Sequence, residues 1–300
     1  MFIIKNKFVF LTISAIIVLS SILAVVVFGL KKSIDFTGGT QLEVSYTTSR
    51  PDISLVSAML SKDNLSDAIV QQEGTTGLSI KSKSLSDEER VVLVSDLSLG
   101  GVYPLTQTSF TSIGPSVGRE LASKAVVAII VVVIAIILYI TFAFRTVSKP
   151  VSSWKYGLIA IATLVHDIAI PSGVFALLGH FYGAEVDTLF VVALLTVLGI
   201  SVSDTIVVFD RIRENLKNHT APTFADTVGK SLNQTFVRSI NTSLTVILVL
   251  VALFFFGPVA TKNFSLVLIV GMFFGTYSSI FVASPLLVIT EGLQHKKGKK

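Results

Sequence analysis

Six apolar stretches, each near the length that crosses a lipid bilayer, constrain this sequence more than any other feature. The first is residues 8–29, and five more follow a long polar segment, at residues 123–144, 156–178, 188–209, 239–257 and 264–289. A membrane-spanning helix needs about 20 mainly apolar residues. Charged residues make up 14% of the chain, against about 25% in an average soluble domain. We therefore expect an α-helical membrane protein with six transmembrane helices, arranged as one plus five.

The first apolar stretch has an alternative interpretation as a cleaved signal peptide. Residues 8–29 exceed the usual apolar core of about 7–15 residues, and no convincing cleavage site of small residues follows. We interpret residues 1–30 as a cytoplasmic N-terminus followed by an uncleaved first helix.

The polar segment, residues 31–122, has the pattern of a small folded domain. Apolar and polar residues alternate in four strand-like stretches, and helix starts are expected at Asp52 and at Ser86, which has Glu89 three residues later as in a capping box. The order βαββαβ predicts a two-layer α/β domain of about 80 residues. It contains no nucleophile–base pair, so we expect a binding or coupling module and not an enzyme. The four strands are expected at residues 41–46, 68–72, 78–83 and 105–112.

Basic residues in the short loops predict the orientation. Loops 145–155 and 210–238 are rich in Lys and Arg, whereas loop 179–187 has none and loop 258–263 has only Lys262. Positive loops stay in the cytoplasm, so both termini and the basic tail 291–300 are expected there, with the small domain outside. The pair Lys31 and Lys32 runs against this pattern. Residues 224–232 are expected to form a short amphipathic helix on the cytoplasmic surface. The loop and tail residues behind this prediction are Arg145, Lys149, Lys155, Arg211, Arg213, Lys217, Lys230, Arg238, Lys296, Lys297, Lys299 and Lys300.

Asp204 is an acidic residue within the apolar stretch 188–209, where a charged side chain is unfavourable. It lies six residues before the charged group that begins at Asp210, about 9 Å inside the membrane at about 1.5 Å per residue. A charged Asp near the bilayer centre costs about 2.5–3.5 kcal/mol on insertion scales, so it needs a partner, a proton or water. Ser201, Asp204 and Thr205 share one helix face.

The next helix offers Asp204 a basic partner. Its first turns carry Arg238 in a polar stripe, at a depth similar to that of Asp204. Two alternatives stay open beside a proton-carrying role: a fixed ion pair that pins two helices, and an arginine that extends to lipid phosphates. The stripe consists of Gln234, Arg238, Asn241 or Thr242, and Thr245.

His166 and Asp167 lie near the middle of the third apolar stretch. Adjacent helical residues project about 100° apart, so we expect that both cannot face one site. One of them could form a hydrogen bond within the bundle without any transport role. We expect no metal site, because the chain has no cysteine and no second His follows His166 at helical spacing.

Three glycine motifs complete the pattern. Gly38 and Gly39, after Asp35, suit a tight turn into the first strand, and no Lys-Ser/Thr follows as a phosphate loop would require. Gly114, Pro115 and Gly118 are expected to form a hinge just ahead of the second membrane helix. Gly271 and Gly275 favour close helix packing, inside the bundle or against a partner.

These motifs together resemble the SecD/SecF family, membrane subunits of the bacterial Sec protein-export machinery within the RND superfamily. A separate chain of 300 residues is similar to the single-subunit SecF form and not to the SecD–SecF fusion. The stretches that carry the resemblance are Ile34–Thr40, Ile113–Gly118, Val165–Asp167, Gly199–Asn215 and Arg238–Ser243.

The resemblance implies a ferredoxin-like extracytoplasmic domain and a place in the cytoplasmic (inner) membrane. It implies a SecD partner, a site beside the SecYEG channel, and use of the proton-motive force on a preprotein after SecA has acted. Asp204 and Arg238 would serve proton flow, with protons as the coupling ion, no cofactor, and no nucleic acid. Two alternatives remain: a proton-driven exporter of small molecules or lipids, and a scaffold that only stabilises its partner in the lipid membrane.

Overall fold

The computed structural model describes residues 2–62, 65–144 and 151–297. Asp63, Arg145, Lys149, Lys299 and Lys300 lie outside the described residues. The chain divides into two compact units, residues 32–126 and residues 1–31 with 127–300. The boundary between the units falls within one long helix, Pro115–Ala143.

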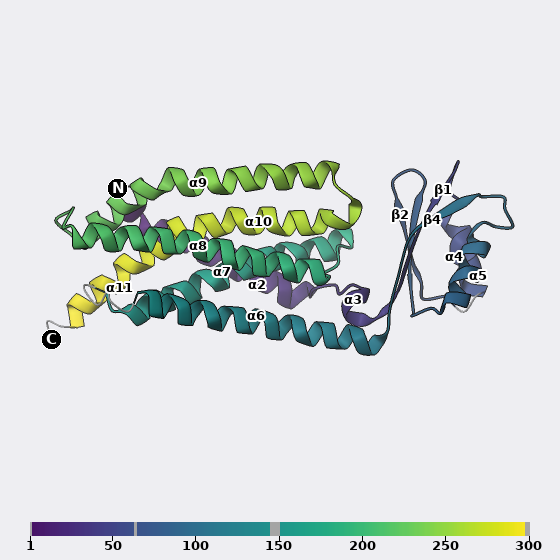
Figure 1. Cartoon of the computed structure of the whole chain (residues 1–300), viewed down its shortest axis with the longest axis horizontal. Helices are drawn as coiled ribbons and strands as arrows, with labels where there is room; N and C mark the ends of the chain where they lie inside the picture. Colours follow the sequence, from purple (N-terminus) through teal and green to yellow (C-terminus); the bar gives the residue numbers. More distant parts are fainter. Residues whose placement is uncertain (1, 63–64, 145–150, 298–300) are drawn as a thin grey trace. The chain divides into compact units, whose positions relative to one another are not determined.

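The helical unit consists of six helices that are long and apolar enough to cross a membrane, counted over the described residues. The predicted number of transmembrane helices is therefore confirmed. The short helix α1 and the last helix α11 lie at the same end of this unit as the turn between α8 and α9 (Figure 1). The bounds are α1 Phe2–Lys5, α2 Lys7–Phe28, α6 Pro115–Ala143, α7 Ser153–Tyr182, α8 Thr188–Lys217, α9 Phe224–Phe256, a 3₁₀ turn Val259–Thr261, α10 Lys262–Ser278, a π-helical turn Ser279–Ala283 and α11 Ser284–Lys297.

The helices extend beyond the apolar stretches that predict them. Residues 224–232, expected as a separate surface helix, are instead the first turns of α9. The physical reason is a cap at the start of this segment: the Thr223 side chain accepts a hydrogen bond from the Asp226 amide at 3.1 Å. A capped polar segment continues the helix without a break, since polar residues also sustain the backbone ladder.

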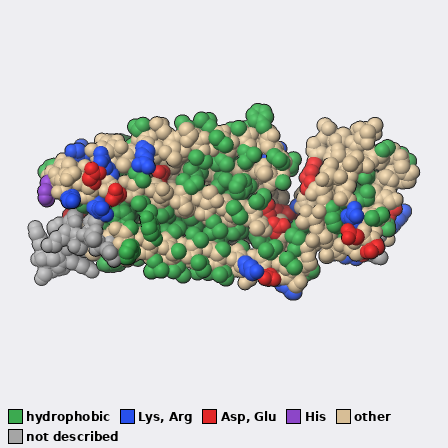
Figure 2. Space-filling model, viewed as in Figure 1, with side chains coloured by type: hydrophobic (Ala, Val, Ile, Leu, Met, Phe, Trp, Pro, Cys, Tyr) green, Lys and Arg blue, Asp and Glu red, His purple; other side chains and the backbone are tan. Residues whose placement is uncertain are grey.

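Burial in the helical unit is uneven. In the most apolar stretch of the α7 span, 61% of residues are buried, against 6% in α6. Large apolar side chains face outward, and Figure 2 shows them spread over the helical unit, with Lys and Arg gathered at the end where α8 and α9 meet. This is the distribution of a bundle surrounded by lipid.

Glycines allow the central helices to approach closely. A Cβ on Gly173 of α7 would lie 2.5 Å from the Cα of Ser21 in α2. A Cβ on Gly275 of α10 would lie 3.0 Å from the Cβ of Ser201 in α8, and one on Gly271 would collide with Val197. The Gly-x-x-x-Gly motif therefore packs inside the bundle, against α8.

The small domain has the predicted order βαββαβ. Its sheet is antiparallel throughout, with strand order β2-β3-β1-β4, and α4 and α5 cover one face (Figure 1). This is the ferredoxin-like arrangement. The bounds are α3 Ile34–Thr37, β1 Gly39–Tyr46, α4 Ile53–Lys62, β2 Ile69–Glu73, β3 Gly77–Ser82, α5 Asp87–Leu97 and β4 Leu105–Ile113.

Side-chain chemistry fixes the register and ends of these elements. Leu42 in the middle of β1 pairs with Ile80 on one side and Phe110 on the other, and it is 0% exposed. The expected capping box opens α5, since Ser86 and Glu89 each bond the other's backbone amide, at 3.2 and 2.8 Å. Local patterns therefore account for most of this unit.

Tyr46 closes one end of the domain core. It is 2% exposed, and its hydroxyl donates to the carbonyl of Leu97 in α5 at 3.3 Å. Burial raises the pKa of Tyr46 to about 12, because the charged phenolate is disfavoured away from water. The strand and the helix are thus joined by a side chain that stays neutral over a wide pH range.

The two glycine motifs of the small domain pack against each other. Gly38 and Gly39 have φ of +76° and +137°, and a Cβ on Gly38 would lie 2.6 Å from the Cα of Pro115. A Cβ on Gly118 would lie 2.7 Å from the Gly38 nitrogen. Pro115 and Gly118 lie in the first turn of α6 and not ahead of it, so the position expected for the hinge is wrong, and hinge motion itself stays a prediction. Proline favours the first helical position, where its fixed φ suits the helix and its missing N–H has no partner to lose.

Candidate functional site

Polar side chains meet in the middle of the helical unit, in a group that we call the polar core. Most come from apolar helices in which hydroxyl residues recur every four positions, such as Ser201 with Thr205 and Ser239 with Ser243, so that they share a face. The polar core consists of His166 and Asp167 of α7, Ser201, Asp204 and Thr205 of α8, Ser239 and Ser243 of α9, Thr276 and Ser278 of α10, and Ser279 of the π-helical turn.

Asp167 is the most enclosed acid of the polar core, with an exposed fraction of 0%. Ser201 donates a hydrogen bond to its Oδ2, and the Ser278 hydroxyl lies 3.1 Å from the same oxygen. The Nδ1 of His166 lies 3.0 Å from Oδ1. One carboxyl therefore joins α7, α8 and α10.

The expectation that His166 and Asp167 cannot face one site is wrong. Their Cα–Cβ bonds diverge, but the imidazole Nδ1 and the carboxyl oxygens lie beyond those bonds and turn back toward each other. His166 is 3% exposed, and its Nε2 has no hydrogen-bond partner among the described residues. Its ring stacks on Tyr277, with centroids 6.1 Å apart. The Tyr277 hydroxyl in turn lies 3.4 Å from the Phe10 carbonyl of α2.

Asp204 lies one helical turn beyond Ser201 and is half-buried. The Ser239 hydroxyl of α9 donates to its Oδ1 at 3.3 Å. The neighbouring Thr205 hydroxyl pairs with Ser279 at 2.9 Å. Asp204 thus lies where α8 faces α9, and Asp167 lies where α8 faces α7 and α10.

Arg238 does not form an ion pair with Asp204. Among the described residues no Lys, Arg or His nitrogen lies within 4.0 Å of the Asp204 carboxyl, although the Arg238 charge is near enough to act on it. Arg238 is exposed and lines a polar hollow of about 270 Å³ between α8 and α9. The other residues that line this hollow are Val207, Asp210, Arg211, Glu214, Gln234 and Thr235.

Asn241 and Thr242 face away from the polar core. Both are exposed, whereas Ser239 and Ser243 on the same helix are buried. The polar stripe expected on this helix is therefore wrong in its choice of face beyond Arg238. The inward face follows the spacing of Thr235, Ser239 and Ser243, four residues apart.

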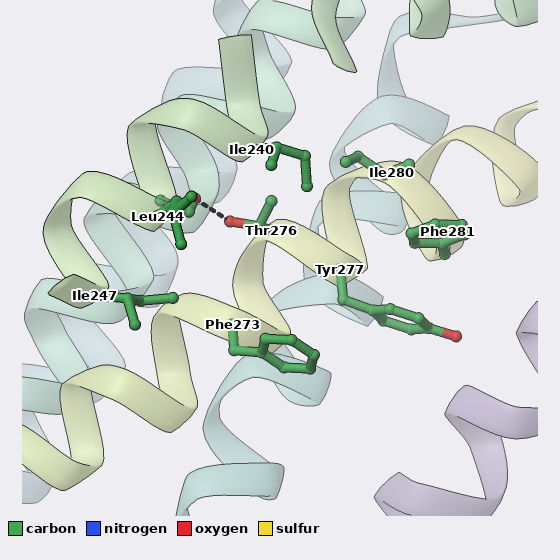
Figure 3. A pocket seen from close by; sticks show the side chains of 9 residues that line it. Ile240, Leu244, Ile247, Phe273, Thr276, Tyr277, Ile280 and Phe281 are labelled. Atoms are coloured by element: carbon green, nitrogen blue, oxygen red, sulfur yellow. Dashed lines mark hydrogen bonds between the residues drawn. The ribbon is translucent and has the colours of Figure 1, made fainter. Parts of the chain in front are cut away.

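An apolar groove of about 230 Å³ lies on the outer side of α9 and α10 (Figure 3). At its floor the Thr276 hydroxyl points to Ser243, with which it forms a hydrogen bond (Figure 3). Because the remaining lining is almost wholly apolar, the groove offers no polar route to Asp204. That lining consists of Ile240, Leu244, Ile247, Phe273, Tyr277, Ile280 and Phe281.

Within the described part of the chain, no three His, Asp or Glu side chains gather as metal ligands. What the polar core offers chemically is two carboxyls, one imidazole and a set of hydroxyls. These groups exchange and hold protons.

Comparison with known proteins gives two matching family models. The model for "Protein export membrane protein SecD/SecF, C-terminal" matches residues 98–292, and the model for the "SecD/SecF GG Motif" matches residues 23–49, which include Gly38 and Gly39. The chain is 42% identical to the protein translocase subunit SecF of Thermobaculum terrenum, over 96% of this chain and 93% of that protein.

Longer proteins and solved structures match as well. The SecDF subunit of Bacillus subtilis is 34% identical over 98% of this chain, which spans 38% of that protein. The crystal structure of SecDF from Thermus thermophilus superposes with a TM-score of 0.81 at 33% identity, covering 95% of this chain and 38% of that one. A SecDF structure in a super-membrane-facing form superposes with a TM-score of 0.67 at 32% identity, covering 98% of this chain and 38% of that one.

Proposed function

The chain belongs to the SecD/SecF family of protein-export membrane proteins, and on this premise we propose that it uses the proton-motive force to drive protein export. Its relatives of similar length are named protein translocase subunit SecF, and an auxiliary role in Sec-dependent export follows for this multi-pass membrane protein. The use of protons is the finer part of the proposal.

The proposal rests on the side chains that surround the Asp204 carboxyl. A carboxyl inside an apolar helix is costly when charged, and a permanent ion pair would hold it charged and fixed. Here its hydrogen-bond partner is a neutral hydroxyl, that of Ser239. Such a carboxyl can gain and lose a proton as its surroundings change, which is what proton coupling requires.

The polar hollow supports a route between Asp204 and water. Its wall includes Val207, about one turn along α8 from Asp204, and Arg238, the residue directly before Ser239 on α9. The positive charge of Arg238 favours release of the Asp204 proton when the two approach and favours it less when they separate. We propose that relative movement of α8 and α9 changes this approach during transport.

We propose that the partner is a SecD subunit. SecDF relatives carry a segment similar to this chain within a protein of which it spans 38%, and the rest of such a protein would supply the SecD part. The assembly would lie beside SecYEG in the cytoplasmic membrane, with both termini in the cytoplasm, and act on a preprotein after SecA. The common location of α1 and α11 at one end of the helical unit supports a shared side for the termini (Figure 1).

The test is Asp204→Asn in a strain that lacks the native chain, with export measured before and after the proton gradient is collapsed. We expect the variant to lose the gradient-dependent part of export while still co-purifying with its partner. Asp226→Asn is the matched control, because Asp226 is an exposed acid at the start of α9. Gradient-dependent export that persists in Asp204→Asn would refute the proton role and leave a scaffold.

A further inference from the structure

The polar core contains a second carboxyl, Asp167, that the proposed function does not use. We propose that His166 and Asp167 together form a second proton-binding site, which takes up and releases one proton in each transport cycle. The inference rests on the proposed function for the cycle itself, but the existence of two protonation states at this site is independent of it. The supporting observations are the hydrogen-bond geometry of Asp167 and the partnerless nitrogen of His166.

Ser278 provides the first argument, because its hydroxyl has two acceptors. It lies 3.1 Å from Asp167 Oδ2 and 2.9 Å from the Gly275 carbonyl of its own helix. A hydroxyl has one hydrogen to donate and rotates to suit its surroundings. When Asp167 is a carboxylate, Ser278 donates to Oδ2. When the carboxyl is protonated on Oδ1, Oδ2 keeps the hydrogen bond from Ser201 and Ser278 donates to Gly275. Either state is satisfied without movement of the helices.

His166 provides the second argument. Its imidazole is 3% exposed, and its Nε2 has no partner among the described residues. A buried polar atom without a hydrogen bond is costly and calls for an unseen partner such as water. The nitrogen on the other side of the ring, Nδ1, already contacts Asp167. The ring therefore presents one nitrogen to the carboxyl and leaves the other in need of a hydrogen-bond partner.

The two nitrogens allow the ring to pass a proton to Asp167 while the imidazole itself stays neutral. A proton from water bonds to Nε2 while the Nδ1–H bond breaks and an O–H bond forms on Asp167 Oδ1. The imidazole stays neutral and changes tautomer, and the carboxylate becomes a neutral acid. The site gains one proton and one unit of positive charge, and no oxidation or reduction is involved. The reverse sequence returns the proton to water.

The surroundings contain few other charges. Among the described residues, Asp167 forms its side-chain hydrogen bonds with His166 of α7, Ser201 of α8 and Ser278 of α10. Asp204 lies one turn along α8 from Ser201, and Tyr277 of α10 stacks on the imidazole. From α2, Ser14 and the Phe10 carbonyl contact the Tyr277 hydroxyl. No Lys or Arg among the described residues forms an ion pair with Asp167, and its ion-pair partner is His166. The proton is thus the available charge compensation.

The first experiment reads protonation directly. The full chain with its partner, in lipid vesicles and carrying Asp204→Asn, is followed by infrared spectroscopy across pH with isotope-labelled aspartate. We expect a pH-dependent carboxylic acid C=O band that disappears on adding Asp167→Asn. If that double variant fails to assemble, Ser278→Ala decides, because removing a hydroxyl bonded to Oδ2 shifts the band. Ser265→Ala is its matched control, another fully buried serine of α10, bonded to the Thr261 carbonyl. No pH-dependent band, or a band that Ser278→Ala leaves in place, overturns the proposal.

The second experiment separates a proton relay from a purely structural histidine. His166→Asn keeps a donor where Nδ1 lies and removes Nε2. We expect it to lose gradient-driven export although it assembles with its partner, and Ser278→Ala to shift the pH profile of export while Ser265→Ala does not. Normal export by an assembled His166→Asn overturns the relay. If Asp204→Asn abolishes gradient-driven export but Asp167→Asn, assembled, does not, this inference fails and the proposed function stands. If neither has an effect, the proposed function fails.

Discussion

The two units of this chain differ in the polar side chains that they bury and in the apolar side chains that they expose. In the small domain the buried side chains are mainly apolar, such as Leu42 and Leu78 at 0% exposed. In the helical unit a fully buried Asp167 lies at the centre, while Leu138 and Val249 are 65% and 69% exposed at the outside. Lipid tails are as apolar as leucine, so burial does not drive helices together in a membrane, and close packing with hydrogen bonds does. The small domain buries apolar side chains as proteins in water do.

The largest expected effect is on helix packing. Gly173→Leu should abolish a folded bundle, because a Cβ there meets the Ser21 backbone of α2. Gly199→Leu is the matched control in α8, since nothing lies within 4 Å of a Cβ at Gly199. The measurement is the yield of monodisperse protein in detergent. Equal yields of the two variants would show that α2 and α7 do not need this contact.

The next effect concerns the core of the small domain. Leu42→Ala should lower the domain's free energy of unfolding by about 2–5 kcal/mol, from lost burial and the cavity left behind. Val91→Ala on α5 should change it little, because Val91 is 57% exposed. Hydrogen exchange of peptides from residues 32–126 of the full chain measures both. A small loss for Leu42→Ala would contradict a core held by apolar burial.

Two glycine substitutions separate the cost of backbone strain from the cost of a steric clash. Gly38→Ala and Gly74→Ala both place a Cβ on a residue with positive φ, +76° and +58°, which costs about 1–2 kcal/mol per residue. Gly38→Ala should cost more, because its Cβ would lie 2.6 Å from the Pro115 backbone, whereas nothing lies within 4 Å at Gly74. Hydrogen exchange in the same peptides compares them. Equal losses would mean that the packing of the two glycine motifs adds nothing.

The smallest expected effect is at Tyr46. Its pKa is raised to about 12 by burial, so folding favours the neutral phenol and this contribution to stability is complete below the ordinary value near 10. It is then lost as pH rises to about 12. Tyr46→Phe should remove this alkaline dependence and cost about 1 kcal/mol through the lost hydrogen bond. The tyrosinate absorbance of wild type minus Tyr46→Phe should appear near pH 12. If Tyr46 titrates near pH 10, its hydroxyl is accessible to water and the domain core is not closed at this end.

The two units also differ in how far their sequence predicts them. In the domain the alternation of residues and the Ser86–Glu89 capping box give elements that start and end within a few residues of those observed, because strand and cap signals are local. In the bundle, composition predicts the six helices, and a lone charge in an apolar run points to Asp204.

The contacts within the polar core could not be predicted in the same way, because they depend on which helix faces meet. The pairing of Asp167 with Ser278 joins residues 111 positions apart. One signal in the sequence does point to these contacts: Ser278 and Ser279 are adjacent serines in an apolar helix, one turn after Gly275. The sequence predicts the helix that carries Arg238 but not the polar hollow that its side chain lines. The alternative that Arg238 extends to lipid phosphates stays a prediction.

The π-helical turn Ser279–Ala283 has a geometric consequence for the last transmembrane segment. A turn of this kind holds one residue more than an α-helical turn, and each α-helical residue rotates the chain by about 100°. Everything after Ala283 is therefore turned around the axis relative to an uninterrupted rod. If the wide turn moved one position along the chain, Ser279 would swing off Thr205 while the rod stayed unbroken. The position of the wide turn therefore decides which hydroxyls the last transmembrane segment presents to its neighbours.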